Sequence, residues 1–186
     1  GCRRRRHELP EPIPRVAVIP LARPVLFLDL DGVVNSVNSK LEIDENGDTL
    51  FVRACKQVDR KLLAELNRVL AGAGCDVVIS STWRKRFSAQ EIADVFVARG
   101  MPDELAERFI DVTDEESVPY DMPDRSGKER GLQIQRWLDV HPERSTFAIV
   151  DDGVDMAHLL PHLVQTDCMD GLTRADADRL IEMLSA

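Results

Sequence analysis

The sequence of 186 residues has no apolar stretch long enough to span a bilayer, so we expect no membrane-embedded segment. It has only four cysteines (Cys2, Cys55, Cys75 and Cys168), which match no zinc-binding spacing, and none is a favoured nucleophile. We expect buried or partly buried thiols in a reducing cytosol, and hence a cytoplasmic protein. Net positive charge is also lacking. The formal charge of −9 argues against a broadly basic surface that binds nucleic acid, but it does not exclude a local basic groove.

The composition otherwise describes an ordinary globular protein, with 44% hydrophobic and 31% charged residues. This length suits one domain with a real core. The first 24 residues differ, because residues 3–6 are four consecutive arginines and five prolines follow them. We therefore divide the sequence into a basic, proline-rich tail over 1–24 and one domain over 25–186. We interpret the tail as a solvated extension, with an arm that contacts nucleic acid as the alternative.

Strand-like and helix-like segments alternate from residue 25 onwards. Short apolar runs typical of strands occupy residues 25–28, 75–79, 109–112, 147–150 and 163–166. Helical spacing of apolar residues or a capping box marks most of the segments between them. The alternation predicts an α/β fold with a mainly parallel sheet and helices on both faces. No internal repeat is found, and no segment is long enough for a large cap domain.

Two segments depart from this alternation. The strand-like runs 41–44 and 49–52 flank the dipeptide Asn46-Gly47, which is a strong hairpin signal. We therefore expect a small β-hairpin flap beside the first strand. Residues 113–127 are acidic and contain Pro119 and Pro123, so we expect a long loop with a functional role.

A pair of aspartates stands directly after the apolar run 25–28. Asp29 and Asp31, followed by Gly32, would emerge at the C-terminal end of a buried strand, where open α/β sheets bind ligands. Neighbouring carboxylates are costly unless a cation or a function holds them there. An isolated Asp-x-Asp-Gly also fits a solvated turn, so the interpretation depends on further motifs.

Three later segments supply such motifs. The second apolar run ends in the hydroxyls of Ser80 and Ser81, Lys128 stands at an expected helix start, and the run 147–150 ends in Asp151-Asp152. The order of strand and Asp-x-Asp, strand and Ser, Lys at a helix, and strand and Asp-Asp resembles the four-motif signature of the haloacid dehalogenase (HAD) superfamily of phosphotransferases. The resemblance covers most of the chain.

A closer resemblance rests on residues 28–35, on residues 80–84 and on the segment 166–173. These are similar to the HAD domains of bacterial multi-enzyme RNA-repair (Swiss Army Knife) proteins and their stand-alone relatives. The resemblance implies a Rossmann-like HAD fold of the capless or minimally capped type. An open site of this kind suits bulky substrates such as polynucleotide ends or phosphoproteins.

The resemblance also implies roles for the carboxylates. Asp29 would be the nucleophile that forms an aspartyl-phosphate, and Asp31 would be the general acid and then the general base. Mg²⁺ would be held by the Asp29 carboxylate, the Asp31 backbone carbonyl and Asp152, with Asp151 in support. Which member of the Asp151-Asp152 pair binds the metal directly stays open. Asp155 is a weaker candidate, equally consistent with a solvated residue in the first turn of a helix.

Candidate phosphate-binding residues follow from the other motifs. Ser80 would donate a hydrogen bond to a phosphoryl oxygen, although the motif position could fall one residue later, on Ser81. Lys128 would neutralise phosphoryl charge at its helix start. Arg84 is a candidate second phosphate contact, and Trp83 could stack on a base. Helix capping, a core aromatic and solvated arginines are the structural alternatives.

The leading hypothesis is a Mg²⁺-dependent phosphomonoesterase that acts on a phosphorylated substrate, with nucleic-acid terminal phosphates as one candidate. Within enzymes, a small-metabolite or nucleotide phosphatase is the alternative. A non-catalytic HAD-like domain that binds a phosphorylated partner is a different class. The intact set of carboxylates, serine and lysine argues against that last class.

Overall fold

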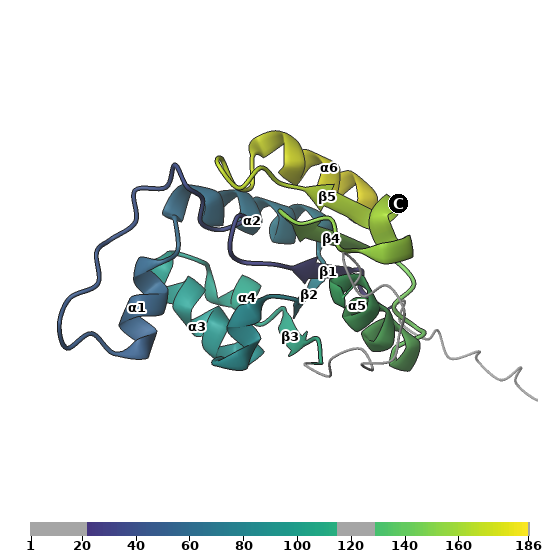
Figure 1. Cartoon of the computed structure of the whole chain (residues 1–186). Coiled ribbons are helices and arrows are strands. Elements are labelled where there is room, and N and C mark those ends of the chain that lie inside the picture. The colour runs from purple at the N-terminus through teal and green to yellow at the C-terminus, as the bar shows by residue number, and fades with distance from the viewer. Residues whose placement is uncertain (1–21, 115–128, 186) are drawn as a thin grey trace, which may run out of the picture.

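A five-stranded parallel sheet forms the centre of the computed structural model, which describes residues 22–114 and 129–185 (Figure 1). The strand order is β3-β2-β1-β4-β5, and all neighbouring strands are parallel. The strands are β1 (Val25–Leu28), β2 (Asp76–Ile79), β3 (Phe109–Val112), β4 (Phe147–Asp151) and β5 (Leu163–Gln165). The predicted α/β class is confirmed, as are the five strands predicted at residues 25–28, 75–79, 109–112, 147–150 and 163–166.

The helices connect the strands as the alternation predicted. They are α1 (Leu50–Lys56), α2 (Arg60–Ala73), η1 (a 3-10 helix, Thr82–Lys85), α3 (Ala89–Arg99), α4 (Asp103–Ala106), α5 (Glu129–Val140), η2 (a 3-10 helix, Ala157–His162) and α6 (Arg174–Leu184). Local signals set several ends: Gly74 ends α2 in the left-handed region, and Ser88 with Glu91 forms a complete capping box at α3. Among the helices described, none has the length and apolar character needed to cross a membrane.

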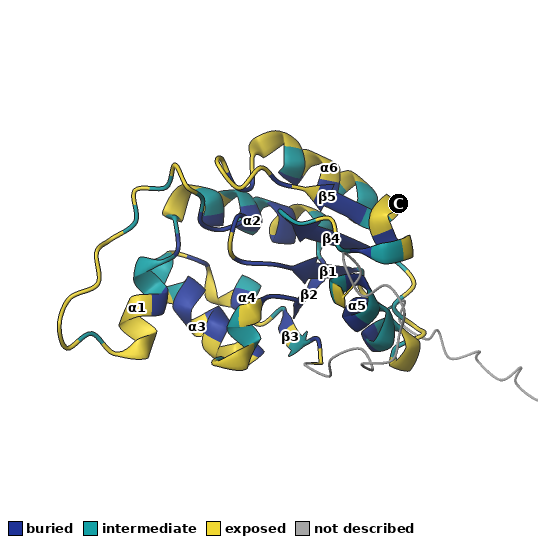
Figure 2. Ribbon diagram, in the orientation of Figure 1, coloured by how far each residue is buried: buried dark blue, intermediate teal, exposed yellow. Residues whose placement is uncertain are grey.

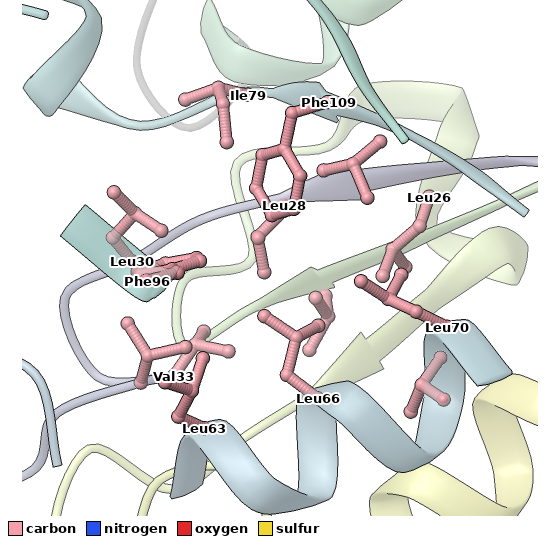
Figure 3. Close-up of a cluster of buried hydrophobic side chains, with 14 of the residues drawn as sticks. Leu26, Leu28, Leu30, Val33, Leu63, Leu66, Leu70, Ile79, Phe96 and Phe109 are labelled. Carbon is pink, nitrogen blue, oxygen red and sulfur yellow. The ribbon is translucent and has the colours of Figure 1, made fainter. Parts of the chain in front are cut away.

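The central strands β1 and β2 are buried on both faces, as a parallel sheet requires (Figure 2). Because side chains alternate along a strand, Leu26 and Leu28 face α2, α3 and α6, as Figure 3 shows for the α2 side. Val25 and Phe27 face the other way, toward α5, where the Phe27 ring meets Trp137 edge-on at 5.4 Å between centroids. Each such fully buried side chain contributes about 1.5–3 kcal/mol. The two clusters hold the C-terminal edge of the sheet in place.

The predicted β-hairpin flap is wrong. Asn46-Gly47 does form a turn, closed by the Asp48 amide donating to the Glu45 carbonyl, but the flanking residues form no strands. Thr49 instead caps α1, because its hydroxyl accepts a hydrogen bond from the Val52 amide. The Lys56 ammonium then donates to the Ile43 carbonyl and the Asp48 carboxylate. The loop therefore satisfies its polar groups with helix side chains rather than a strand partner.

Several predictions lie outside the described residues: the tail over 1–21, most of the acidic segment 113–127, and Lys128. Within the described segments the chain contains no inserted cap domain. Of the cysteines described, Cys75 is buried and its pKa is raised by burial to about 12, so its thiol stays protonated. Cys55 is partly buried as expected, whereas Cys168 is exposed, contrary to the expectation of burial.

Candidate active site

Strand register brings the sequence motifs to one edge of the sheet. Leu28 of β1 pairs with Ile79 of β2 and with Val150 of β4, so the residues that follow these three are neighbours. The Asp29 amide donates to the Val150 carbonyl (3.0 Å), and the Ser80 amide donates to the Leu28 carbonyl (2.8 Å). The carboxyl ends of parallel strands are where α/β folds bind ligands. Asp29, Ser80 and Asp151 thus meet at that edge.

Three carboxylates gather there. Asp29, Asp151 and Asp152 each offer an oxygen, and these oxygens lie within 4.8 Å of one another. Oxygen donors at this spacing fit Mg²⁺, which prefers carboxylate ligands. Gly32 makes room for the group: its φ is +75°, and a Cβ on it would lie 2.5 Å from the Asp152 Oδ2 atom. The donor set and the glycine next to it therefore suit a divalent cation.

Burial of the cluster disfavours the charged forms of its carboxylates. Burial raises the pKa of Asp29, while Arg130 opposes that rise. Burial and the Asp29 charge raise the pKa of Asp151 to about 7, again against the effect of Arg130. The Gly153 amide donates to Asp151 Oδ1 at 2.8 Å and fixes its orientation. A cation among these carboxylates would favour their charged forms.

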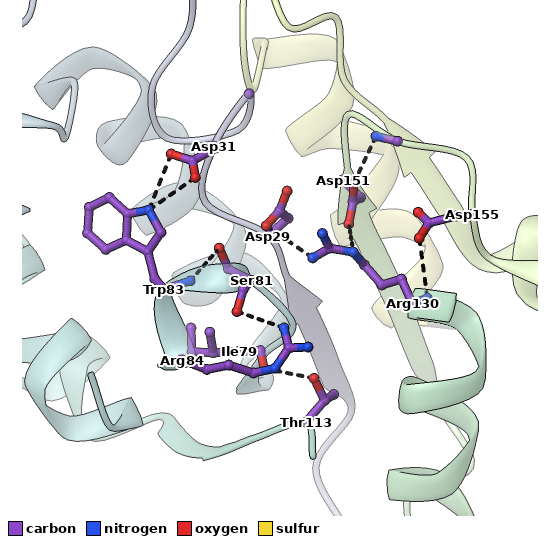
Figure 4. A network of polar contacts seen from close by, with 12 residues as sticks. Asp29, Asp31, Ile79, Ser81, Trp83, Arg84, Thr113, Arg130, Asp151 and Asp155 are labelled. Atoms are coloured by element: carbon purple, nitrogen blue, oxygen red, sulfur yellow. Dashed lines mark hydrogen bonds and ion pairs between the residues drawn. The ribbon is translucent and has the colours of Figure 1, made fainter. Parts of the chain in front are cut away.

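Arg130 is the residue that sequence reasoning missed. Its guanidinium donates to Asp29 Oδ1 at 3.2 Å and pairs with Asp151 Oδ2 at 3.1 Å, and its side chain is only 18% exposed (Figure 4). Its backbone amide donates to the Asp155 carboxylate at 3.3 Å. Asp155 therefore anchors the start of α5 and lies outside the three-carboxylate cluster of the described residues. The available signal was a second cation only two residues after Lys128.

The start of α5 packs directly on the loop that follows β4. The Gly131 amide donates to the Asp155 carbonyl, and a Cβ on Gly131 would lie 2.2 Å from the Met156 carbonyl oxygen. Only glycine allows this approach, which places Arg130 beside the carboxylates. Lys128 itself lies outside the described residues, so its role stays a prediction.

Asp31 stands apart from the cluster, with an exposed carboxylate. The Trp83 indole Nε1 lies 3.2 Å from both carboxylate oxygens, and the Asn35 amide donates to Oδ1 at 2.9 Å. Asn35 in turn accepts from the Gly32 amide at 3.0 Å. Trp83 therefore packs against the hydrophobic core while its indole N–H points toward Asp31, and its role in stacking on a base stays a prediction. These donors orient Asp31 on the side of η1 (Figure 4).

Among the serines that follow β2, Ser81 forms a side-chain hydrogen bond with Asp29. A hydrogen bond from Ser81 lowers the pKa of Asp29, although less than burial raises it. The Ser81 hydroxyl also accepts from the Trp83 amide at 3.4 Å, as the cap of η1. The Ser80 Oγ atom is buried and has no hydrogen-bond partner among the described residues. Ser80 and Ser81 therefore both stay predicted phosphate-binding residues, as the sequence left them.

Arg84 joins η1 to α5. Its guanidinium donates to the Ser81 carbonyl and to the side-chain carbonyl of the buried Gln133, both at 2.7 Å. It therefore lies beside the site, and its part in phosphate binding stays a prediction.

The segment after β5 fastens the turn that carries Asp31. The buried Thr166 hydroxyl donates to the Gly32 carbonyl at 2.7 Å, and the Leu172 amide donates to the Val33 carbonyl at 2.9 Å. Gln165 donates to the Asp152 carbonyl at 3.0 Å. Residues 166–173 therefore help to hold the turn that carries the Asp-x-Asp motif.

Fold and site together define a HAD-like domain. It has a parallel α/β sheet with aspartates at the C-terminal ends of β1 and β4 and serines directly after β2. Residues 25–177 match the family model described as the HAD domain in Swiss Army Knife RNA repair proteins. The chain therefore belongs to this family of HAD domains. The match supports a HAD-type phosphatase in general. Comparison with curated proteins and with solved structures found no match.

Proposed function

We propose that the protein is a Mg²⁺-dependent phosphomonoesterase that removes terminal phosphates from nucleic acid through an aspartyl-phosphate. The observation that carries this proposal is the placement of Asp29 beside two further carboxylates and Arg130 at the carboxyl edge of the sheet. The family description, which names RNA repair proteins, supports the class of substrate.

Asp29 acts as the nucleophile. One of its carboxylate oxygens attacks phosphorus, and the bond from phosphorus to the leaving-group oxygen breaks. Burial raises the pKa of Asp29 and so works against its charged form, and Arg130 and Ser81 oppose part of that rise. The same two groups can donate hydrogen bonds to phosphoryl oxygens once a substrate is bound. Lys128 and Arg84 are further proposed phosphate contacts.

Asp31 serves the leaving group. Its carboxyl donates a proton to the departing oxygen, and the resulting carboxylate then accepts a proton from the water that hydrolyses the aspartyl-phosphate. Trp83, whose one indole N–H is shared between the two carboxylate oxygens, and Asn35 hold it for both steps. Its exposure gives water access to it.

Asp29, Asp151 and Asp152 would hold Mg²⁺, together with the Asp31 backbone carbonyl that the family resemblance implies. The ion, when bound, supplies positive charge that screens the repulsion between carboxylates and phosphate and orients the phosphoryl group. Because the oxygens of all three carboxylates lie close together, both Asp151 and Asp152 are candidates for direct metal ligands.

The test is Mg²⁺-dependent phosphate release from an aryl phosphate, nucleotides, sugar phosphates and oligonucleotides with 3′ or 5′ phosphates. Asp29→Asn should abolish release, whereas Asp94→Asn, a matched change on the exposed face of α3, should not. Best turnover of mononucleotides or sugar phosphates would favour the small-metabolite alternative. No turnover of any substrate with any divalent metal would refute the enzyme hypothesis and favour the alternative of a non-catalytic domain that binds a phosphorylated partner.

A further inference from the structure

A cavity of about 500 Å³ opens between α1 and η1 and includes Asp31 in its lining. None of the three clustered carboxylates, Asp29, Asp151 and Asp152, lines it. Its volume is in the range of small-molecule sites. The cavity therefore adjoins the acid–base residue but not the residues proposed to hold the metal and the phosphoryl group.

This position matches that of a leaving group. Asp31 can protonate only an oxygen within hydrogen-bond reach, so the group attached to that oxygen must lie on its side of the site. Whatever the phosphate is cleaved from must therefore extend into the cavity between α1 and η1.

One wall of the cavity is apolar and aromatic. It includes Leu50, which is 49% exposed, and the rings of Trp83 and Phe87, whose centroids are 5.9 Å apart at an angle of 38°. The hydrogen bonds from Trp83 to Asp31 fix the indole. Partly exposed aromatic faces of this kind suit stacking with a nucleobase.

The rim of the same cavity is basic. It includes Arg53, Lys85 and Arg86, although the whole chain has a net charge of −9. Arg53 approaches Asp44 at 4.0 Å, while Lys85 and Arg86 form no ion pair with any residue in the described part of the chain. A cluster of exposed cations beside an aromatic wall matches the phosphodiester backbone of a single strand.

We propose that this cavity is the leaving-group subsite of the enzyme. The terminal nucleoside lies against Trp83, and the next phosphodiesters contact Arg53, Lys85 and Arg86. The inference rests on the proposed function and deepens it: the substrate is the end of a single-stranded polynucleotide, and a free mononucleotide, which lacks those phosphodiesters, is a poorer one.

The test measures binding, so it needs no turnover. Asp29→Asn protein is titrated into a labelled short single-stranded oligonucleotide with a terminal phosphate, and a mononucleotide is used as competitor. Three phosphodiester contacts should give a slope of about −2 in log affinity against log salt, at about −0.7 per contact. Lys85→Gln and Arg86→Gln should each remove about 0.7 from its magnitude. Arg179→Gln, an equal change of charge on the exposed side of α6, should leave the slope unchanged.

Equal affinity for mononucleotide and oligonucleotide would overturn the inference. So would a slope that Lys85→Gln and Arg86→Gln alter no more than Arg179→Gln does. Mg²⁺-dependent turnover of the same oligonucleotide and of an aryl phosphate by the unmutated protein is measured in parallel. If neither these nor any other substrate of the panel is turned over with any divalent metal while the binding results hold, the proposed phosphatase activity fails, and the cavity remains a binding site for single-stranded ends.

Discussion

Replacing Asp151 by asparagine should stabilise the metal-free protein at neutral and higher pH. Asp151 is 2% exposed, and burial together with the Asp29 charge raises its pKa from 3.8 to about 7. The folded state therefore binds a proton more tightly than the unfolded state. Stability contributed by this group is complete below the unfolded pKa and is lost as the pH rises to about 7.

The magnitude follows from the size of that shift. Three pKa units correspond to about 4 kcal/mol at about 1.4 kcal/mol per unit. This is the upper value for the unfolding free energy that Asp151→Asn can gain at high pH. Asparagine also loses the 3.1 Å ion pair with Arg130, which offsets part of the gain. We expect Asp151→Asn to be more stable than the unmutated protein by about 1–3 kcal/mol near pH 8, with little or no advantage near pH 5.

The assay is urea unfolding in the presence of a chelator, repeated across this pH range. Asp94→Asn serves as the control, because its exposed site should give no pH-dependent difference. Added Mg²⁺ should stabilise the unmutated protein by mass action and the Asp151→Asn protein much less. A stability difference that stays constant from about pH 5 to about pH 8 would refute the reasoning.

Three further substitutions test the supports of the site. Gly32→Ala would place a Cβ 2.5 Å from Asp152 Oδ2 at a φ of +75°, so Mg²⁺ affinity measured by calorimetry should fall, and unchanged affinity would contradict the cluster. Thr166→Val removes the 2.7 Å hydrogen bond to the Gly32 carbonyl and should lower the unfolding free energy by about 1–3 kcal/mol in urea titrations; an unaltered midpoint would count against the bond. Trp83→Phe keeps a ring but removes the Nε1 donor to Asp31, so kcat should fall more for an alkyl phosphate than for an aryl phosphate, whose leaving group needs less protonation. Equal losses for both would argue against Asp31 as the acid.

The sheet and most helices were predictable because their signals are local. The fully buried run of β1 admits only one assignment, and Gly74 and the Ser88 capping box end or start their helices by backbone chemistry alone. The meeting of Asp29 with Asp151 also followed, since parallel strands bring their carboxyl ends together.

The predicted hairpin was wrong because side-chain contacts that the strand pattern does not show decide the structure there. The Asn46-Gly47 turn is real, but whether strands or a helix follow depends on Thr49 and Lys56 satisfying the loop. The sequence also could not show which serine contacts Asp29, because the apolar run does not reveal which way each side chain points.

Arg130 was missed for a related reason. The sequence offers two cations there, Lys128 and Arg130, and the placement of Arg130 depends on the close contact of Gly131 with the Met156 carbonyl. That contact joins segments that are distant in the sequence, so spacing alone could not indicate it.

Trapping of the phosphoryl-enzyme tests the central claim most directly. Protein mixed with a turned-over substrate and Mg²⁺ is quenched in acid and digested, and its peptides are examined by mass spectrometry. The account predicts one added phosphoryl group on the peptide that contains Asp29, released by hydroxylamine and absent from Asp29→Asn. Phosphate release without any modification of that peptide, or with the phosphoryl group on another residue, would contradict the assignment of Asp29 as the nucleophile.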